Sequence, residues 1–279
     1  MLKRILALLM CAALMLPAGA AAQEMENRVL EDSFSYEGEN IRITVEQYAC
    51  TYKKDDLRYF VVHVYTERPD QLKTAFAGEE YSKTAAEATS EIGARHGAVI
   101  AINGDYYNYK DNVGLVIRNG VLYRDCKSVR DQLLISKDGE FIALPEGEYV
   151  QGTGQSYVDA GMEQCFTFGP LLVLDGQATQ LPRDYMIATD DGTLQPRTAI
   201  GQVGENHYVI LIADGRRRKW SEKGMNMTQM QQILVEEGCQ IAYNLDGGGS
   251  TTLIINGELI NKPSGSRERN VSDIIYFTE

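Results

Sequence analysis

The chain has 279 residues, 27 Lys and Arg against 39 Asp and Glu, and a formal net charge of −12 at pH 7. Such an acidic surface repels phosphate backbones, so composition argues against sequence-independent binding of nucleic acid. With 44% hydrophobic residues, the chain can bury the core of one large domain, or of one domain with a small appendage.

The first 22 residues have the pattern of a secretory signal peptide. Lys3 and Arg4 precede an apolar run from Ile5 to Leu16, and small residues follow. The run is too short and wrongly flanked for a membrane-spanning anchor. We therefore expect cleavage after residues 1–22 and a secreted or cell-envelope protein, extracellular or periplasmic, with no stable membrane insertion.

Four cysteines remain after the signal peptide, and they are widely spaced without a CxxC pair. They are Cys50, Cys126, Cys165 and Cys239. Two disulfides under any of three pairings and buried free thiols are equal alternatives. Metal binding through these cysteines is not predicted.

The first half of the chain alternates strands with one helix. Two β-rich runs within residues 41–66 have period-two alternation and predict paired strands. The pattern TAAEATSEIGARH predicts a helix over 84–96, and AVIAIN predicts a strand that ends at Asn103. Asn-Gly at 119–120 and Asp-Gly at 138–139 predict two β-hairpins, because these pairs suit the left-handed turns that hairpins need.

The second half contains one further helix, predicted over 228–238. Thr228 with Gln231 three residues later resembles a capping box. The segments around this helix predict strands and a further Asn-Gly hairpin: HYVILIA, IAYNL, TTLIINGELI and VSDIIYF. Hairpins outnumber helices, so we predict an α+β fold, largely antiparallel or mixed sheet with a few packed helices.

The stretch NLDGGGST, residues 244–251, places three glycines directly after a strand. A nucleotide P-loop and a dinucleotide fingerprint both require a helix next, whereas a hairpin follows here. A turn remains in which amide groups converge on an anion beside Asp246, with hydroxyl donors from Ser250 and Thr251. A tight bulge between two strands is the plain structural alternative.

The segment from residue 224 to residue 265, which contains NLDGGGS, resembles the signature of the phosphodiester glycosidase family. This family includes the uncovering enzyme, which removes N-acetylglucosamine from a sugar-1-phosphate diester. Further matches follow in order: AINGDYYN at 101–108, GLVIRNG at 114–120, RTAIGQ at 197–202, ADGRR at 213–217 and RNVSD at 269–273. The resemblance divides the chain into a signal peptide (1–22), a β-rich segment (23–74) and a phosphodiester glycosidase domain (75–279).

The resemblance implies a hydrolase of carbohydrate metabolism that cleaves the C1–O–phosphate bond of a sugar-1-phosphate diester. The substrate would be a phosphorylated glycan of a cell wall, an exopolysaccharide or a host. An oxocarbenium-like transition state requires a carboxylate near the anomeric carbon, and Asp246 is the first choice. Asp105 and Asp214 compete for a second acidic role, although family members often carry a small residue in place of Asp105. Asn103 ends a strand, as residues of catalytic faces often do.

A phosphate-ester leaving group is already anionic, so it needs cations and N–H donors more than it needs a strong acid. Guanidinium groups suit this role because they pair with phosphate through two hydrogen bonds. The predicted substrate-binding residues are Arg197, Arg216, Asn244, Gly247, Gly248, Gly249, Ser250, Thr251 and Arg269. As alternatives, Arg197 pairs with a carboxylate and Asp214 only forms a turn, while Tyr106 and Tyr107 either stack on a sugar or pack in the core.

No cofactor is required by these motifs. His63, His96 and His207 are far apart and form no zinc-binding spacing, and nothing in the acidic residues specifies a divalent cation. Two other functions stay open. One is a non-catalytic phosphoglycan-binding envelope protein, and the other is a phosphodiesterase that cleaves the P–O bond.

Overall fold

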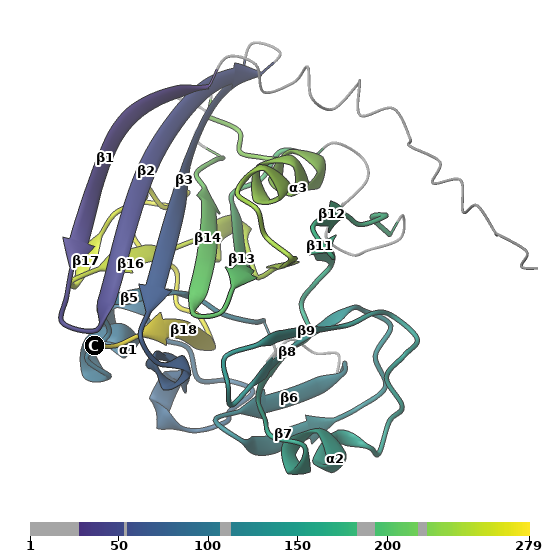
Figure 1. Ribbon diagram of the computed structural model, residues 1–279. Helices are drawn as coiled ribbons and strands as arrows, with labels where there is room; N and C mark the ends of the chain where they lie inside the picture. The colour runs from purple at the N-terminus through teal and green to yellow at the C-terminus, as the bar shows by residue number, and fades with distance from the viewer. Residues whose placement is uncertain (1–27, 53–54, 107–112, 183–192, 217–221) are drawn as a thin grey trace, which may run out of the picture.

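A computed structural model of the chain describes residues 28–52, 55–106, 113–182, 193–216 and 222–279 (Figure 1). The predicted signal peptide and Tyr107 lie outside these ranges. Within them, the named strands form three sheets whose pairings are all antiparallel, accompanied by three α-helices. The predicted α+β fold is therefore confirmed.

The first sheet has eight strands, and its central strands are buried on both faces, whereas its two edge strands, the first and the last in the order that follows, are exposed. Its order is β1 (Val29–Glu37), β2 (Ile41–Tyr52), β3 (Asp55–Thr66), β14 (His207–Ala213), β13 (Arg197–Gly204), β15 (Ile241–Asn244), β11 (Leu171–Leu174) and β12 (Gln177–Ala178). Alternate residues of β3 face opposite sides, so Val62 and Val64 enter one core cluster while Tyr59 and Val61 enter another. Because β3 pairs with β14, the strands predicted within 41–66 complete this sheet. The domain boundary after residue 74 stays a prediction.

The second and third sheets have five strands each; in Figure 1 strands of the second are seen behind the lower parts of β1–β3, and the third lies below. The second has the order β17 (Glu258–Leu259), β16 (Leu253–Ile255), β5 (Ile100–Asn103), β18 (Asp273–Phe277) and β4 (Leu72–Phe76). The third has the order β7 (Val121–Asp125), β6 (Leu115–Arg118), β10 (Met162–Phe166), β8 (Gln132–Ser136) and β9 (Phe141–Leu144). One core cluster takes residues from all three sheets, for example Ile210, Ile102 and Leu133.

The helices are short: α1 (Thr89–Arg95), α2 (Gly154–Asp159) and α3 (Met227–Glu236). The helix predicted over 84–96 begins five residues late, because Glu87 instead forms an isolated bridge with Val271 of the second sheet. Within the described ranges, no helix has both the length and the apolar character needed to span a bilayer.

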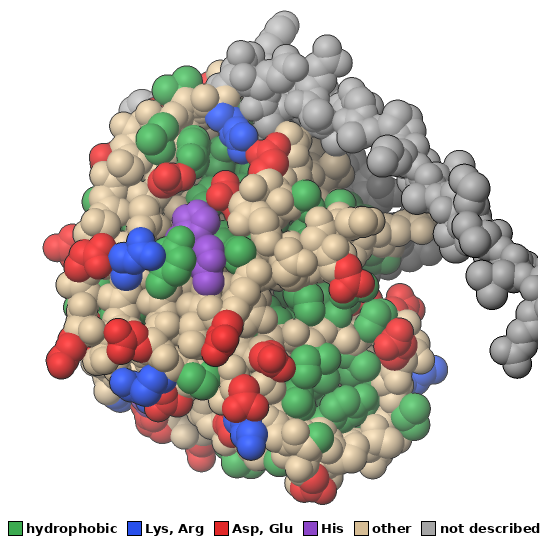
Figure 2. Space-filling view, viewed as in Figure 1, with side chains coloured by type: hydrophobic (Ala, Val, Ile, Leu, Met, Phe, Trp, Pro, Cys, Tyr) green, Lys and Arg blue, Asp and Glu red, His purple; other side chains and the backbone are tan. Residues whose placement is uncertain are grey.

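The cysteines of the described chain are all free thiols. Cys50, Cys165 and Cys239 are buried and Cys126 is partly exposed. The surface is acidic, and on the face shown in Figure 2 acidic side chains outnumber basic ones, in keeping with the net charge of −12.

The structure shows that the capping box predicted at the start of α3 was placed at the wrong residues. Asn226, not Thr228, is the N-cap: its side chain accepts a hydrogen bond from the Gln229 amide at 2.8 Å, and the Gln229 side chain accepts one from the Asn226 amide at 3.0 Å. Asn is a strong N-cap, and here it provides an acceptor for the Gln229 amide two residues before Thr228. Gln231 turns away and donates to the carbonyl oxygens of Leu172 and Thr179 at 3.0 and 2.8 Å.

We expect Asn226→Ala to lower the free energy of unfolding by about 1 kcal/mol, because it leaves helix amides without an acceptor. Urea denaturation measures the change. Thr228→Ala is the matched control, since Thr228 is exposed on the first turn of α3. A larger loss for Thr228→Ala than for Asn226→Ala would contradict this assignment.

Candidate active site

The chain between β15 and β16, residues 245–252, is here called the glycine loop. It joins the first sheet to the second. The amide of Leu245 donates to the Thr198 carbonyl on β13 at 2.9 Å, and that of Asp246 donates to the Gly104 carbonyl just past β5 at 3.3 Å. A 3-10 turn, η5 (Gly248–Ser250), follows. The loop therefore lies where strand ends of two sheets meet.

The three glycines make room for other groups. A Cβ on Gly247 would lie 2.7 Å from the carbonyl oxygen of Pro196. Gly248 has φ +60°, and its Cβ would lie 3.0 Å from Nη1 of Arg216. A Cβ on Gly249 would lie 3.1 Å from Cδ of Arg269. Bare backbone is thus needed for one close backbone contact and for two arginine side chains that lie on the loop.

Most of the loop amides already have acceptors. The amide of Gly248 donates to Pro196 O at 2.8 Å, that of Ser250 to Gly247 O at 3.1 Å, and that of Thr251 to Gly248 O at 3.4 Å. Their predicted contact with phosphate stays a prediction. The guanidinium groups of the two arginines are the cationic donors beside the loop.

Asp246 is partly exposed at the start of the loop. Burial of its carboxyl raises its pKa to about 6, against hydrogen bonds from the Ser250 hydroxyl and the Gly247 amide and the charge of Arg269. Asp105 adds to the rise through like charge. The group is therefore an ionised carboxylate at neutral pH that protonates in mild acid.

The other two candidate carboxylates are enclosed. Asp105 is 4% exposed, and its carboxylate accepts hydrogen bonds from the Tyr106 and Thr167 amides, each at 2.7 Å. Asp214 is 1% exposed and accepts from the Asn261 side chain at 3.1 Å and from the Lys262 amide at 3.0 Å. Burial raises the pKa of Asp214 to about 6. Of the three predicted acids, only Asp246 has solvent access.

Asn103 is fully buried, and both ends of its side chain are hydrogen-bonded. Its Nδ2 donates to Asp246 O at 2.5 Å, and its Oδ1 accepts from the Thr198 hydroxyl at 2.9 Å and the Thr252 amide at 3.2 Å. This amide fixes the start and the end of the glycine loop to β5 and β13. Its geometry is that of a positioning residue.

Three predicted substrate-binding side chains of this region are buried instead of facing solvent: Asn244, Ser250 and Thr251. Asn244 donates to the Gly169 carbonyl at 2.7 Å. Within the described residues, Asn244 Oδ1 and Thr251 Oγ1 are buried without a hydrogen-bond partner. Their roles in binding stay predictions.

The three predicted arginines differ in exposure. Arg197 is 2% exposed and donates to the carbonyl oxygens of Met225 and Thr193 at 3.1 and 3.3 Å. Arg216 is exposed, has φ +59°, and donates to the Gln195 side chain at 2.5 Å. Arg269 is exposed and lies against Gly249. Arg216 and Arg269 are thus the accessible pair beside Asp246.

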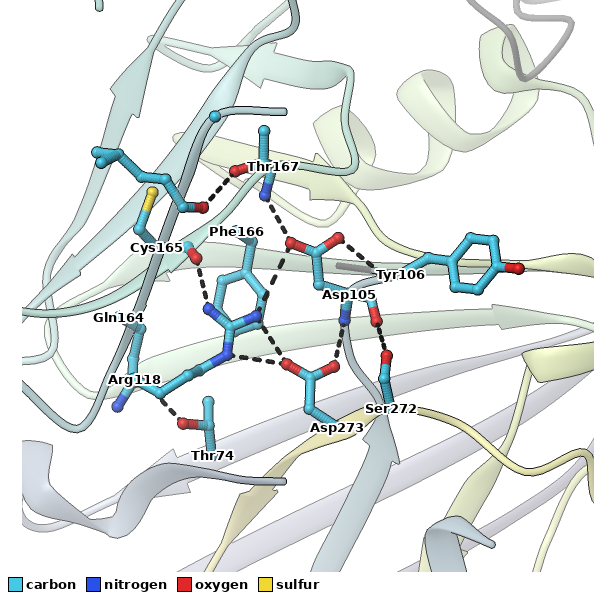
Figure 3. A network of polar contacts seen from close by, with 12 residues as sticks. Thr74, Asp105, Tyr106, Arg118, Gln164, Cys165, Phe166, Thr167, Ser272 and Asp273 are labelled. Atoms are coloured by element: carbon cyan, nitrogen blue, oxygen red, sulfur yellow. Dashed lines mark hydrogen bonds and ion pairs between the residues drawn. The ribbon is translucent and has the colours of Figure 1, made fainter. Parts of the chain in front are cut away.

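A buried ion network lies beneath the site, and its centre was missed by the sequence analysis (Figure 3). Nε and Nη2 of Arg118 donate to Oδ2 of Asp273 at 2.8 and 2.7 Å, and Nη2 lies 3.8 Å from Oδ2 of Asp105. The other Asp273 oxygen accepts from the Asp105 amide at 2.8 Å. Burial raises the pKa of Asp273 to about 7 against the charge of Arg118.

One signal could have found this pair. Arg118 follows the apolar LVI of β6, and Asp273 precedes the apolar IIYF of β18. A charge that ends a buried strand needs a partner of opposite sign. Sequence alone does not say which strands are neighbours.

His63 and His207 come together although they are far apart in sequence. Their Nδ1 and Nε2 atoms lie 3.1 Å apart, and His207 begins β14 at the end opposite Asp214. In the described part of the chain, no three His, Cys, Asp or Glu side chains form a group that could hold a metal ion.

Comparisons with known proteins agree on one family. The family model described as phosphodiester glycosidase matches residues 96–278. The chain is 31% identical over 205 residues to the SPbeta prophage-derived uncharacterized protein YomE of Bacillus subtilis, and 27% identical over 195 residues to N-acetylglucosamine-1-phosphodiester alpha-N-acetylglucosaminidase of Bos taurus. These matches cover 71% and 66% of this chain but 30% and 36% of those proteins. The chain thus spans about a third of the length of these curated relatives.

Solved structures share the fold. The catalytic domain of zebrafish N-acetylglucosamine-1-phosphodiester alpha-N-acetylglucosaminidase, auto-inhibited by its pro-peptide, matches with a TM-score of 0.70 and 20% identity, over 90% of this chain and 89% of that one. A putative exported protein from Burkholderia pseudomallei matches with a TM-score of 0.53 and 14% identity, over 81% of this chain and 75% of that one.

We expect Arg118→Met to lower the free energy of unfolding by about 3–5 kcal/mol, because two buried carboxylates lose their counter-charge. Urea denaturation at pH 8 measures this. Arg68→Met is the matched control: Arg68 pairs with Asp70 at 3.2 Å on the exposed surface, and such pairs contribute under about 1 kcal/mol.

The double variant Arg118→Met/Asp273→Asn should regain part of the loss, because it also removes one unpaired charge. Equal losses for Arg118→Met and Arg68→Met would show that the buried network does not stabilise the fold.

Proposed function

The chain belongs to the phosphodiester glycosidase family, and from that premise we propose that it hydrolyses the C1–O–phosphate bond of a sugar-1-phosphate diester. One observation carries the proposal: a partly exposed carboxylate, Asp246, lies on the loop against which two exposed guanidinium groups pack, those of Arg216 and Arg269. A carboxylate for the anomeric carbon and cations for the phosphate are the two things this reaction requires.

The chemistry needs only one accessible carboxylate. As positive charge develops at the anomeric carbon, Asp246 either removes a proton from an attacking water molecule or attacks the carbon itself, forming an ester that water then hydrolyses to free sugar. The bond to the phosphate oxygen breaks with its electron pair on that oxygen. The departing phosphate ester is stabilised by Arg216 and Arg269, so no buried acid has to protonate it.

The remaining predicted site residues hold this geometry. Asn103 fixes both ends of the glycine loop, and Asp214 binds the side chain of Asn261, which itself donates to the Thr251 carbonyl at 3.2 Å. Arg197 holds the chain before β13 to that before α3. We assign these three residues, and Asp105, to positioning rather than to direct contact with substrate.

We further propose that the protein acts outside the cytoplasm, on a phosphorylated glycan of a cell wall, an exopolysaccharide or a host. The support is the signal-peptide pattern of residues 1–22 and the acidic composition. A fold shared with a putative exported protein is in keeping with this.

Two other functions follow from the same loop. A phosphodiesterase would cleave P–O instead of C–O, and a phosphoglycan-binding protein would cleave neither bond. The argument for the binding protein is that Asp246 alone among the three predicted acids is accessible, which leaves no second accessible acid. Hydrolysis in ¹⁸O-labelled water separates them. Label in the sugar supports the glycosidase, label in the phosphate supports the phosphodiesterase, and tight binding without turnover supports the binding protein.

Asp246→Asn should reduce kcat on a sugar-1-phosphate diester by at least about 100-fold, because the amide cannot act as the base or nucleophile. Release of free sugar measures the rate. Asp138→Asn, an exposed carboxylate in the turn after β8, is the matched control and should retain full activity. Undiminished turnover by Asp246→Asn removes Asp246 from the mechanism.

The pH profile should follow the carboxyl of Asp246. Its pKa of about 6 lies above the ordinary value of an aspartate, so kcat/KM should rise with pH through about 6 and level off above it. The substrate phosphodiester stays ionised throughout this range. A rising limb near pH 4 instead would mean that the titrating group is an ordinary exposed carboxyl.

A further inference from the structure

Three aromatic rings form a cluster on the surface at the end of β4. The centroids of Phe76 and Tyr123 lie 5.0 Å apart with their planes at 89°, those of Phe76 and Tyr81 lie 5.9 Å apart, and those of Tyr81 and Tyr123 lie 5.4 Å apart. We call these three residues the aromatic platform. Edge-to-face and tilted contacts at such distances fix the rings relative to one another.

The platform is anchored from below and open above. Phe76 is 8% exposed and packs against Val116 of β6, whereas Tyr123 on β7 is 39% exposed and Tyr81 is partly exposed. If the three rings served only the hydrophobic core, we would expect all of them to be buried. An exposed tyrosine on a rigid base presents a fixed apolar ring face and a hydroxyl group to solvent.

The platform lies at the same end of the second sheet as Asp246. Strands β16, β5, β18 and β4 are neighbours in that order. The glycine loop leads into β16, Asp105 follows β5, and Asp273 at the start of β18 pairs in register with Phe76 at the end of β4. Three strand spacings, about 14 Å in all, separate β16 from β4.

The guanidinium groups of Arg216 and Arg269 lie against the glycine loop, next to Asp246. In the proposal that follows, they hold the phosphate, the anomeric carbon lies at Asp246, and the sugar side of the substrate extends along this end of the sheet towards β4. One sugar ring at Asp246 is too short to reach the platform, whereas a chain of several sugars reaches it.

On the basis of the proposed function, we propose that the aromatic platform of Phe76, Tyr81 and Tyr123 binds a distal sugar of the glycone. The substrate is then an oligosaccharide or polysaccharide whose reducing-end sugar carries the phosphodiester, and the enzyme releases that chain whole. Tyrosine rings stack on the apolar C–H face of a pyranose, and their hydroxyl groups suit the hydroxyl groups of sugars. Their rigidity keeps the entropy cost of binding low.

The test compares two substrates with the same leaving group. They are the 1-(p-nitrophenyl phosphate) diesters of N-acetylglucosamine and of its β-1,4-linked tetrasaccharide. We expect the wild-type protein to prefer the tetrasaccharide, and Tyr123→Ala to lower the ratio of kcat/KM for tetrasaccharide over monosaccharide by about tenfold, the loss of one stacking contact. Tyr123→Phe keeps the ring and should restore most of the ratio.

Val121→Ala is the matched control, because Val121 lies on the same strand, is 50% exposed and has no part in the ring cluster. It should leave the ratio unchanged. An equal effect of Tyr123→Ala on both substrates, or no effect on either, would overturn the proposal.

Failure of the proposed function has a different outcome. If the wild-type protein hydrolyses neither diester, titration calorimetry with the free tetrasaccharide decides the platform by itself. Binding that is lost in Tyr123→Ala and kept in Val121→Ala upholds the platform as a glycan site without catalysis. Absence of binding to the wild-type protein overturns it.

Discussion

The buried pairing of Arg118 with Asp273 is the constraint on which the site depends. A guanidinium removed from water must find a carboxylate at hydrogen-bond distance, and this requirement fixes β6 of the third sheet against β18 of the second. From Asp273 the hydrogen bonds continue to the Asp105 amide, and the neighbouring Gly104 carbonyl accepts from the amide of Asp246. A charge pair that never meets solvent thus sets the position of the one accessible carboxylate.

The sequence predicted well whatever depends on local periodicity. Alternating strands and Asn-Gly or Asp-Gly turns gave the α+β class and the hairpins, and the glycine run gave the location of the candidate site. The arrangement of three sheets depends on pairings between distant strands, such as β3 with β14 and β5 with β16, which no local pattern contains. The predicted capping box was wrong for a smaller reason, since Asn226 offers an acceptor two residues before Thr228 does.

The exposure of the three predicted arginines could not be predicted from the sequence either, because it depends on contacts between distant segments. In the sequence, Arg197, Arg216 and Arg269 are equivalent guanidinium groups in matching motifs. Their division depends on the backbone around each side chain: Arg197 at the start of β13 meets two carbonyl oxygens, whereas Arg216 and Arg269 follow strands or loops that end at the surface. The glycines have a further role that the sequence did not indicate, because a side chain at Gly248 or Gly249 would crowd Arg216 or Arg269, while the binding of phosphate by their amides stays a prediction.

The backbone of Arg216 has a consequence of its own. Its φ of +59° is a left-handed conformation that glycine adopts freely and that strains an ordinary residue by about 1 kcal/mol or more. The strained backbone of Arg216 is therefore a cost to folding at the position that places a guanidinium group against Gly248, which is in keeping with the role proposed for that side chain.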